Sequence, residues 1–422
     1  MESGKLKEEN ENNSQLDKQT VHSQLPKDWE IKKLGEVCEV GAGNSAPQKK
    51  EFFLDGIFPF IRTSDVGKIR KGIIDSSIDY LNDEGIKKMR LFKKGTILFP
   101  KSGASTFLNH RVIMNIDGYV SSHLATIKPS AVLKNEFIWY YLILIDAKDL
   151  MQNVAYPSLK LSDIKQIKIP IPPLPEQKRI VSILDRAFEA IDQAKANAEQ
   201  NLKNAKELFQ SKMQSIFENG KLKVESGEWE EKKLGDVSIF SQGIQVGLKK
   251  HLTYPKDGYV RFIRIIDYTQ NTDDIRYVPN PGKKYYVNEN DIVMIRYGTP
   301  GLIGRGKSGV IANNLFRIKI NVKSISNDFL VLYLSQRKIQ KKLSTQGSAT
   351  MPALNFRQLK TVIIYYPKST SEQKQIVQKL DQLQGKTKKL EAIYQQKIDD
   401  LEELKKSILQ KAFSGQLIME NE

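Results

Sequence analysis

The sequence contains very little cysteine and histidine. Cys38 is the only cysteine among 422 residues, so an intramolecular disulfide is impossible and nothing indicates an oxidising compartment. It lies in the apolar segment GEVCEV, where we expect a small core residue rather than a nucleophile. The histidines form no cluster with metal-ligand spacing, so a structural zinc site is not expected.

Long hydrophobic runs are also missing. No stretch approaches the roughly 18 consecutive apolar residues of a transmembrane helix. Residues 1–25 mix acidic, basic and amide side chains and lack the apolar run of a signal peptide. We predict that 1–25 form a disordered arm and that the protein is cytoplasmic and does not bind a membrane.

Positive charge, in contrast, is in excess. The chain has 66 Lys and Arg against 49 Asp and Glu, a formal net charge of +17 at pH 7. Excess lysine can serve solubility alone. A soluble protein this basic more often has a polyanionic partner, and nucleic acid is the commonest one.

The most informative feature is an internal repeat. WEIKKLGEV at 29–37 returns as WEEKKLGDV at 229–237, and EQKRIVSILD at 176–185 returns as EQKQIVQKLD at 372–381. Weaker matches between these anchors keep the same order. The period is near 195 to 200 residues, far longer than a solenoid unit, so the sequence predicts two copies of one domain-plus-helix module.

Each copy of the repeat has two parts, a strand-rich domain followed by a long helix. Short β-branched segments bounded by Gly, Pro, Asn and Asp predict the strands of a mixed α/β domain, with one helix that begins at an Asn cap, at Asn135 and Asn327. Near-heptad apolar stripes then predict a long coiled-coil helix in each copy. The predicted core positions are Ile180, Leu184, Ile191 and Leu202 in the first helix and Ile376, Leu380, Leu390 and Leu401 in the second.

The two long helices need a partner for their stripes. An antiparallel pair within one chain would place one domain at each end of a rod. Homodimerisation through separate coiled coils is the alternative. Two similar basic domains at a fixed separation would suit DNA, whose recognition sites recur on one face about every 10 base pairs.

The order of motifs is specific. WxxxxLGEV, the Gly-rich GAGNSAP, PFIRxxD, GTILF, the PIPPLPEQ linker and EQKRIVSILD, followed by the whole set again, resembles the specificity subunit of type I restriction-modification systems over residues 26–420. The resemblance implies two target-recognition domains that each bind half of a bipartite double-stranded DNA site. It also implies long helices that dock two methyltransferase subunits, which use S-adenosylmethionine, and further restriction/translocase subunits. The chain itself would have no catalytic site, metal or cofactor.

The predicted fold class is therefore α/β, with two similar mixed α/β target-recognition domains, two long antiparallel coiled-coil helices and an internal pseudo-twofold repeat. The predicted boundaries are 1–25 for the arm, 26–170 for the first domain, 171–222 for the linker and first helix, 223–367 for the second domain, and 368–422 for the second helix and tail.

Candidate DNA contacts lie in loops that flank the predicted strands. Base edges and phosphates are read mainly by Arg, Lys, Asn, Gln, Ser and Thr. In the first domain the candidates are Arg62, Ser64, Lys101, Ser102, Asn109, His110, Arg111, Ser122, His123, Tyr156, Ser158 and Lys160. In the second they are Gln242, Gln245, Arg264, Tyr268, Arg296, Tyr297, Thr299, Arg305, Lys307, Asn313 and Asn314, with the stretch 347–351. His123 and Asn314 align, and we expect these two positions to contact DNA first.

Two other functions compete with DNA reading. GLIGRGKS at 301–308 fits the phosphate-binding Walker A pattern, but the residues after it predict a turn and a strand where that loop needs a helix. The second alternative is a coiled-coil adaptor that binds proteins and no DNA. Salt separates the adaptor from a DNA reader, because DNA binding weakens with a log-log slope of about −0.9 per neutralised phosphate.

Overall fold

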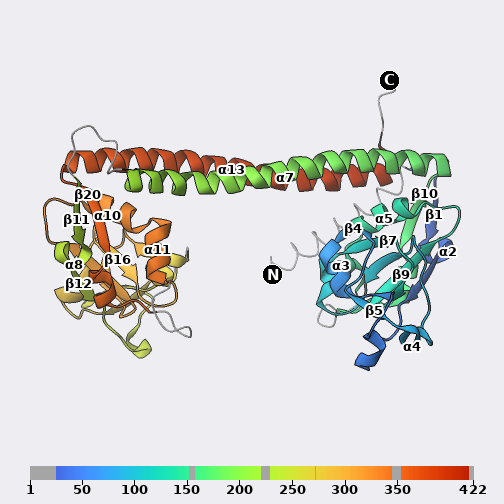
Figure 1. Ribbon diagram of the computed structural model, residues 1–422, viewed down its shortest axis with the longest axis horizontal. Coiled ribbons are helices and arrows are strands. Elements are labelled where there is room, and N and C mark those ends of the chain that lie inside the picture. The colour runs from blue at the N-terminus through green and yellow to red at the C-terminus, as the bar shows by residue number, and fades with distance from the viewer. Residues whose placement is uncertain (1–24, 152–156, 220–228, 271, 345–352, 418–422) are drawn as a thin grey trace, which may run out of the picture. The chain divides into compact units, whose positions relative to one another are not determined.

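The computed structural model describes residues 25–151, 157–219, 229–270, 272–344 and 353–417 (Figure 1). The chain divides into two compact units, unit 1 from 1–197 with 397–422 and unit 2 from 198–396. Each unit holds a mixed α/β domain and one part of both long helices, α7 (Leu174–Asn219) and α13 (Thr370–Phe413). The predicted fold class is confirmed.

Unit 1 contains a five-stranded sheet of order β2-β9-β6-β7-β4, a three-stranded sheet of order β5-β3-β8, and the antiparallel pair β1-β10. The strands are β1 (Glu30–Lys33), β2 (Cys38–Ala42), β3 (Phe58–Ile61), β4 (Lys71–Ile74), β5 (Asp79–Leu81), β6 (Ile97–Pro100), β7 (Arg111–Met114), β8 (Tyr119–Val120), β9 (Leu124–Pro129) and β10 (Lys168–Ile171). The helices are α2 (Leu34–Val37), η2 (Lys50–Phe53), α3 (Thr63–Ile69), α4 (Asp83–Ile86), η3 (Ala104–Leu108), α5 (Asn135–Leu144), η4 (Ala147–Leu150) and α6 (Leu161–Lys165).

Unit 2 has two four-stranded sheets, of order β12-β19-β16-β17 and β14-β13-β18-β15, and the antiparallel pair β11-β20. The strands are β11 (Trp229–Lys233), β12 (Ser238–Gln242), β13 (Tyr259–Ile263), β14 (Arg276–Pro279), β15 (Tyr286–Val287), β16 (Ile292–Ile295), β17 (Ile303–Gly304), β18 (Gly309–Ile311), β19 (Leu315–Ile320) and β20 (Ile363–Pro367). The helices are α8 (Leu234–Val237), η5 (Leu248–Lys250), α9 (Ile266–Thr269), η6 (Lys283–Tyr285), α10 (Asn327–Leu334), α11 (Arg337–Ser344) and α12 (Phe356–Lys360).

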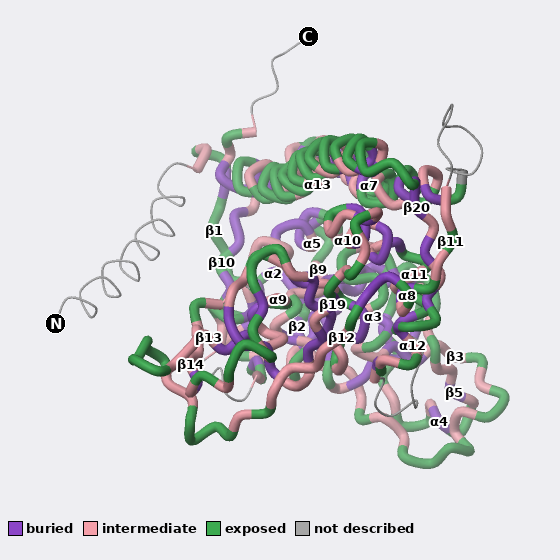
Figure 2. Tube along the Cα trace, turned by 90° about the vertical axis from the view of Figure 1, so that its left-hand side faces the viewer, coloured by how far each residue is buried: buried purple, intermediate pink, exposed green. Residues whose placement is uncertain are grey.

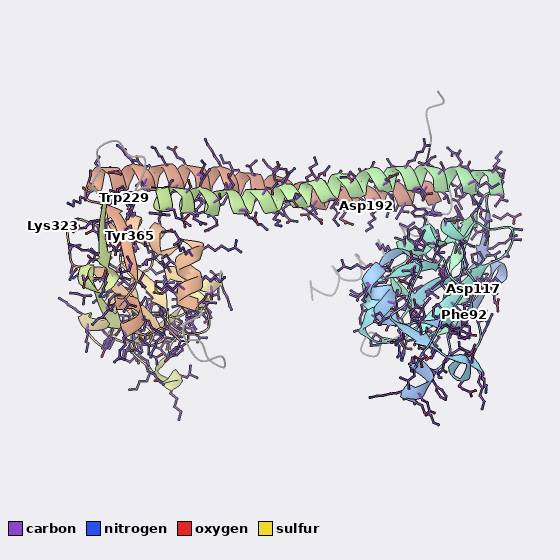
Figure 3. The ribbon with its side chains drawn as sticks, in the orientation of Figure 1. Phe92, Asp117, Asp192, Trp229, Lys323 and Tyr365 are labelled. Atoms are coloured by element: carbon purple, nitrogen blue, oxygen red, sulfur yellow. The ribbon has the colours of Figure 1, made fainter. Side chains whose placement is uncertain are left out.

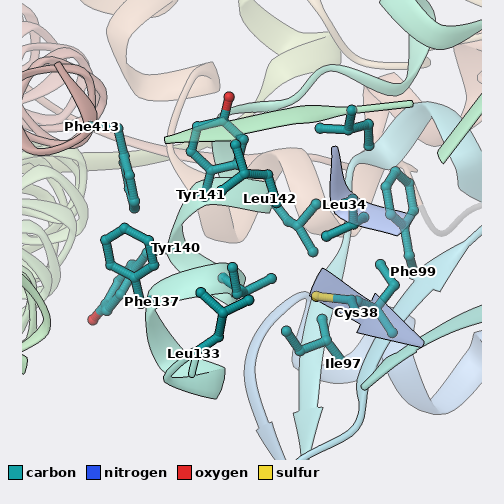
Figure 4. Close-up of a cluster of buried hydrophobic side chains, with 14 of the residues drawn as sticks. Leu34, Cys38, Ile97, Phe99, Leu133, Phe137, Tyr140, Tyr141, Leu142 and Phe413 are labelled. Carbon is teal, nitrogen blue, oxygen red and sulfur yellow. The ribbon is translucent and has the colours of Figure 1, made fainter. Parts of the chain in front are cut away.

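The main core of unit 1 includes the end of α13. Figure 4 shows Phe413 beside Phe137 and Tyr141 of α5, and the ring centroids lie 5.0 Å and 5.1 Å apart. Cys38 lies in the same core, and burial raises the pKa of its thiol to about 12. A thiol with so high a pKa is a poor nucleophile, in agreement with its prediction as a core residue.

The main core of unit 2 includes the end of α7. Phe217 packs edge-to-face on Phe329 and Tyr333 of α10, with centroids 5.5 Å and 5.2 Å apart. Trp229, which Figure 3 labels at the start of β11, packs on the same Phe329 ring, with centroids 6.4 Å apart. In both units a long helix is therefore part of the domain core.

The repeated LG dipeptide has a steric reason. A Cβ on Gly35 would lie 2.9 Å from the Cβ of Lys165 in α6, and one on Gly235 would lie 2.8 Å from the Cβ of Lys360 in α12. Glycine therefore allows the first short helix of each unit to pack closely on a helix near its end.

Within unit 1 the two long helices run antiparallel, as predicted. Asp192 of α7 pairs with Lys405 of α13 at 2.6 Å, and Lys195 pairs with Glu402. From the first pair to the second, the residue number increases along α7 and decreases along α13, so the two helices run in opposite directions. Figure 2 shows that much of the surface of α7 and α13 is exposed.

The predicted coiled-coil positions divide by their surroundings. The buried positions are Ile180, Leu184, Ile191, Ile376 and Leu380. Leu202 and Leu401 are only half-buried, and Leu390 is 38% exposed, so the prediction of a core position at Leu390 is wrong. A strict seven-residue repeat drifts about 20° per heptad around an α-helix. A helix covered by one neighbour buries only a narrow stripe, and Leu390 falls outside it.

The glutamine of the first EQK motif ties α7 to its domain. Gln177 is 1% exposed, and its amide oxygen accepts a hydrogen bond from the backbone N–H of Lys134 at 2.9 Å. Its amide nitrogen donates to the carbonyl oxygens of Val132 and Pro172 at 3.1 Å and 3.0 Å. One side chain thus joins the start of α7, the linker before it and the loop before α5.

The second copy repeats this arrangement. Gln373 is fully buried and accepts from the backbone N–H of Ser326 at 2.9 Å. It donates to the carbonyl oxygens of Ser324 and Pro367 at 2.7 Å and 2.8 Å. The EQK motif therefore recurs because each long helix is attached to its domain by the same buried amide.

We expect Gln177→Met and Gln373→Met to lower the free energy of unfolding, since each leaves three backbone groups without a partner at a buried site. The loss is about 1–3 kcal/mol for each buried group that stays unpaired. Urea unfolding measures it. Gln193→Met is the matched control on α7, because Gln193 is exposed and its amide donates to the exposed side chain of Asn197, and its effect should stay within about 0.5 kcal/mol. Equal stability of all three variants would contradict the structural role.

Candidate nucleic-acid interface

Both units hold the same set of backbone contacts, here called the frame. It lies where the loop that contains Gly43 or Gly243 packs against the turn before β9 or β19. In unit 1 the N–H of Gly43 donates to the carbonyl oxygen of Leu124 at 3.1 Å, and in unit 2 that of Gly243 donates to Leu315, also at 3.1 Å. Each glycine is followed by an isolated parallel bridge, Asn44 with Ser121 and Ile244 with Ala312. The two frames are therefore equivalent.

Only glycine fits this frame. A Cβ on Gly43 would lie 2.2 Å from the carbonyl oxygen of Val120, and a Cβ on Gly243 would lie 2.2 Å from those of Ile311 and Ala312. These are backbone atoms that cannot move aside, so the close approach requires a residue without a side chain. The loop and the turn are held together in the same way in both units.

In unit 2 this frame borders an open pocket of about 480 Å³. Four predicted contact residues line it: Gln245, Arg264, Asn313 and Asn314. The rest of the wall is apolar and comprises Ile244, Val246, Phe262, Ile265, Ile266 and Ala312. Few polar groups on an apolar concave surface are typical of a ligand site.

Side chains at the same place in unit 1 are smaller or aromatic. Ser45 stands where unit 2 has Gln245, and Ser122 and His123 stand where it has Asn313 and Asn314. His123 is exposed, and its Nδ1 lies 2.7 Å from the Oγ of Ser102. The shared frame thus presents different hydrogen-bonding groups in the two units.

The predicted match between His123 and Asn314 agrees with the backbone. The carbonyl oxygen of His123 accepts from the N–H of Lys101, and that of Asn314 accepts from the N–H of Arg296, both at 2.9 Å. The residue after each of these N–H donors forms an isolated antiparallel β-bridge, Ser102 with Ser158 and Tyr297 with Ala353. The structure therefore brings together Lys101, Ser102, Ser122, His123 and Ser158 in unit 1, and Arg296, Tyr297, Asn313 and Asn314 in unit 2.

Arg62 and Arg264 also occupy equivalent positions, but both are tied to carboxylates. The backbone N–H of Arg62 donates to Asp65 at 2.7 Å, and its guanidinium pairs with Asp79. The backbone N–H of Arg264 donates to Asp267 at 2.8 Å, and its guanidinium pairs with Asp274 at 3.1 Å. These arginines hold the start of α3 and α9 in place.

Arg111 was predicted to contact DNA, but its side chain is fully buried. Its guanidinium carbon lies 3.1 Å from the centroid of the Phe99 ring and its Nη1 donates to the carbonyl oxygen of His110 at 2.7 Å. Burial lowers the pKa of the guanidinium well below its usual range. A side chain in this position cannot reach a DNA ligand, so Arg111 is corrected to a core residue.

Two neighbours of Arg111 also have contacts within the fold. Asn109 has a left-handed backbone, with φ of 52°, and its amide binds Asp146 at 3.0 Å and the N–H of Ala147 at 2.8 Å. Burial lowers the pKa of His110, and the charge of Arg70 lowers it further. This segment supports the fold of unit 1.

The remaining candidates are spread over both units. Ser64, Lys160 and Thr299 are exposed, while Gln242 is half-buried and donates to the carbonyl oxygen of Asn313 at 2.9 Å. Arg305 pairs with Asp328 at 2.5 Å. The predicted contacts at Tyr156 and 347–351 lie outside the described residues.

The Walker-like segment does not form a phosphate loop. After Lys307 the chain enters β18, at Gly309, where a P-loop needs the N-terminus of a helix. The Nζ of Lys307 lies 5.9 Å from the centroid of the Tyr268 ring, which in turn packs on Gly304. Tyr268 and Lys307 therefore cover the short strand β17.

Sequence reasoning missed the apolar wall of the pocket and Ser45. Ile244, Val246 and Ile266 carry no signal of a binding site, since apolar residues next to strands usually belong to a core. The Gly-rich loop that contains Ser45 was visible as a motif, but its position opposite Ser122 depends on strand pairing.

In the part of the chain that the structure describes, no helix is long and apolar enough to cross a membrane. Nor do three or more His, Cys, Asp or Glu side chains among these residues gather as a possible metal site.

The comparisons with known proteins agree with this duplicated frame. Two stretches, 26–204 and 226–402, each match the type I restriction modification DNA specificity domain. The chain belongs to this family. Together the two matches span most of the sequence, one on each copy of the repeat.

Individual relatives are themselves specificity subunits of type I restriction enzymes. The chain is 26% identical over 442 residues to the putative type I restriction enzyme MjaX specificity subunit of Methanocaldococcus jannaschii, covering 95% of this chain and 96% of that protein. It is 33% identical over 184 residues to the MjaIX specificity subunit of the same organism, a match that spans only 41% of that relative.

Two solved structures share the fold. One belongs to work on complex assembly and conformational transition of the type I R-M system, with a TM-score of 0.78 and 21% identity over 93% of this chain and 99% of that one. The other is the HsdS subunit from Thermoanaerobacter tengcongensis, with a TM-score of 0.59 and 22% identity over 93% and 98% of the two chains.

We expect Arg111→Ala to lower the free energy of unfolding by about 2–5 kcal/mol, because it empties a fully buried site under Phe99. Chemical denaturation measures the loss. Lys101→Ala is the control in the same unit, since Lys101 is only half-buried and should have little effect on stability. Unchanged stability of Arg111→Ala together with weaker DNA binding would restore the original prediction of a DNA contact.

Proposed function

We propose that this chain is the DNA target-recognition subunit of a type I restriction-modification complex, and that each unit reads one half of a bipartite site. The observation that carries the proposal is the equivalent backbone frame around Gly43 and Gly243, which presents different polar groups in the two units. A common frame gives both units the same way to approach DNA. The divergent side chains allow them to read unrelated sequences.

The partners in this proposal are double-stranded DNA, two methyltransferase subunits, and restriction/translocase subunits. The net charge of +17 favours a polyanionic ligand. Because the two units repeat the same domain and helix, they would offer two similar docking surfaces, one for each methyltransferase subunit. The chain itself is non-catalytic in this proposal and needs no cofactor. The methyltransferase subunits use S-adenosylmethionine.

The test is co-expression with the host's methyltransferase subunit, followed by genome-wide mapping of methylated adenines by single-molecule sequencing. We expect one bipartite motif with an unspecified spacer of fixed length, because two units within one chain read two half-sites. A stable complex with the methyltransferase subunit but no new methylation would contradict DNA reading and favour the protein adaptor.

Within this assay, Asn314→Ala should weaken recognition of one half-site only, because Asn314 lines the pocket of unit 2 while unit 1 has His123 at the equivalent position. The expected loss is about 1–3 kcal/mol in binding free energy, measured by titration of the complex on duplexes altered in either half. His123→Ala is the matched variant and should affect the other half-site. Equal loss at both halves for either variant would refute the assignment.

A further inference from the structure

Two amide side chains meet at the rim of the unit 2 pocket. The Nδ2 of Asn313 lies 3.3 Å from the Oε1 of Gln245 and donates a hydrogen bond to it. Gln245 is exposed and Asn313 is half-buried. Among the residues that the structure describes, neither side chain makes another hydrogen bond.

This pairing leaves a definite set of free groups. The Nε2 of Gln245 keeps its donors, and the Oδ1 of Asn313 keeps its acceptor sites. Exchanging nitrogen and oxygen in both amides gives the same result, because one amide must still donate and the other must still accept. The two amide atoms that take no part in the pairing are therefore one donor, the Nε2 of Gln245, and one acceptor, the Oδ1 of Asn313.

Adenine is the base whose major-groove edge complements that pattern. Its N7 accepts a hydrogen bond and its N6 amino group donates one, whereas guanine presents two acceptors, N7 and O6. Guanine would place its O6 against the free amide oxygen. Cytosine presents a single donor in this groove and thymine a single acceptor, so each would leave one amide group unmatched.

The arginines that line or border the pocket are not free to read guanine. Arg264 is held by Asp267 and Asp274. The guanidinium of Arg296 lies over the rings of Tyr297 and Phe316, 4.6 Å and 5.6 Å from their centroids. Bidentate contact of arginine with guanine N7 and O6 would require these contacts to break. The amides are thus the polar groups that reach a base with least rearrangement.

The wall beside the amides is apolar. Ile244, Val246 and Ile266 line the same pocket of about 480 Å³. Thymine carries a C5-methyl group on the major-groove edge of the A·T pair, and apolar side chains are its usual contact. Both bases of one pair can therefore meet complementary groups on this surface.

We propose that unit 2 reads an A·T base pair through the major groove. Gln245 and Asn313 contact adenine N7 and N6, and the apolar wall contacts the thymine methyl group. This inference rests on the proposed function. Unit 1 carries Ser45 and Ser122 at the equivalent positions, which lack the paired amides, so the preference belongs to unit 2 alone.

The test uses the wild-type chain in complex with its methyltransferase subunits and duplexes of the target found by methylation mapping. At each A·T pair in turn, adenine is replaced by 7-deazaadenine, which lacks the N7 acceptor, or thymine is replaced by uracil, which lacks the methyl group. At one pair we expect both replacements to weaken binding. Replacing that pair with G·C should weaken binding about 5- to 150-fold, the range for a bidentate contact with a base.

The double variant Gln245→Ala with Asn313→Ala should bind the A·T and G·C forms at that position equally, and 7-deazaadenine should no longer weaken it. Ser45→Ala with Ser122→Ala is the matched control and should keep the full response at this pair. The other base pairs of the same half-site report the folding of unit 2, since a folded double variant still discriminates there.

Each result decides one question. A wild-type complex that reads no bipartite target overturns the proposed function. A wild-type complex that reads such a target, but responds to 7-deazaadenine and uracil together at no pair, overturns only this inference. A double variant that loses discrimination at a G·C pair, while keeping it at every A·T pair, overturns it as well.

Discussion

The architecture depends on one hydrogen-bonded group, the buried amide of Gln177 and its copy Gln373. Each joins a long helix to the linker before it and to the loop before the principal domain helix. A buried amide with all its bonds made is rigid, because breaking any of them leaves a polar group without water or partner. The orientation of each domain on its own helix segment follows from this contact, and so does the surface that the domain turns outward.

The two copies in this chain share the backbone frame but differ in the side chains around it, and these two facts have different causes. Gly43 and Gly243 occupy sites where any Cβ would strike a backbone carbonyl, so this part of the repeat tolerates no change. Ser45 and Gln245, two residues after these glycines, are exposed and have no such constraint. Serine and histidine in one unit, and glutamine and asparagine in the other, can therefore be exchanged without disturbing the strands behind them.

Sequence reasoning predicted what periodicity and repetition encode. The duplication, the mixed α/β class, the antiparallel helices and the core position of Cys38 all follow from patterns longer than one residue. Single residues were harder. Arg111 has the residue type of a DNA contact, and only the packing of Phe99 over its guanidinium places it inside. Asn135 and Asn327 were predicted as caps, but they are the first residues of their helices, after Lys134 and Ser326. The pocket of unit 2 joins segments far apart in sequence, and no local pattern carries that pairing.

The composition of unit 1 has a consequence for how the chain is made. Its core draws on Leu409, Ala412 and Phe413 as well as on residues near the amino terminus, whereas unit 2 is one continuous stretch, 198–396. A ribosome synthesises the amino-terminal domain first, yet that domain lacks part of its core until α13 has emerged. Unit 2 has all its residues earlier, so during translation the second domain can complete its core before the first.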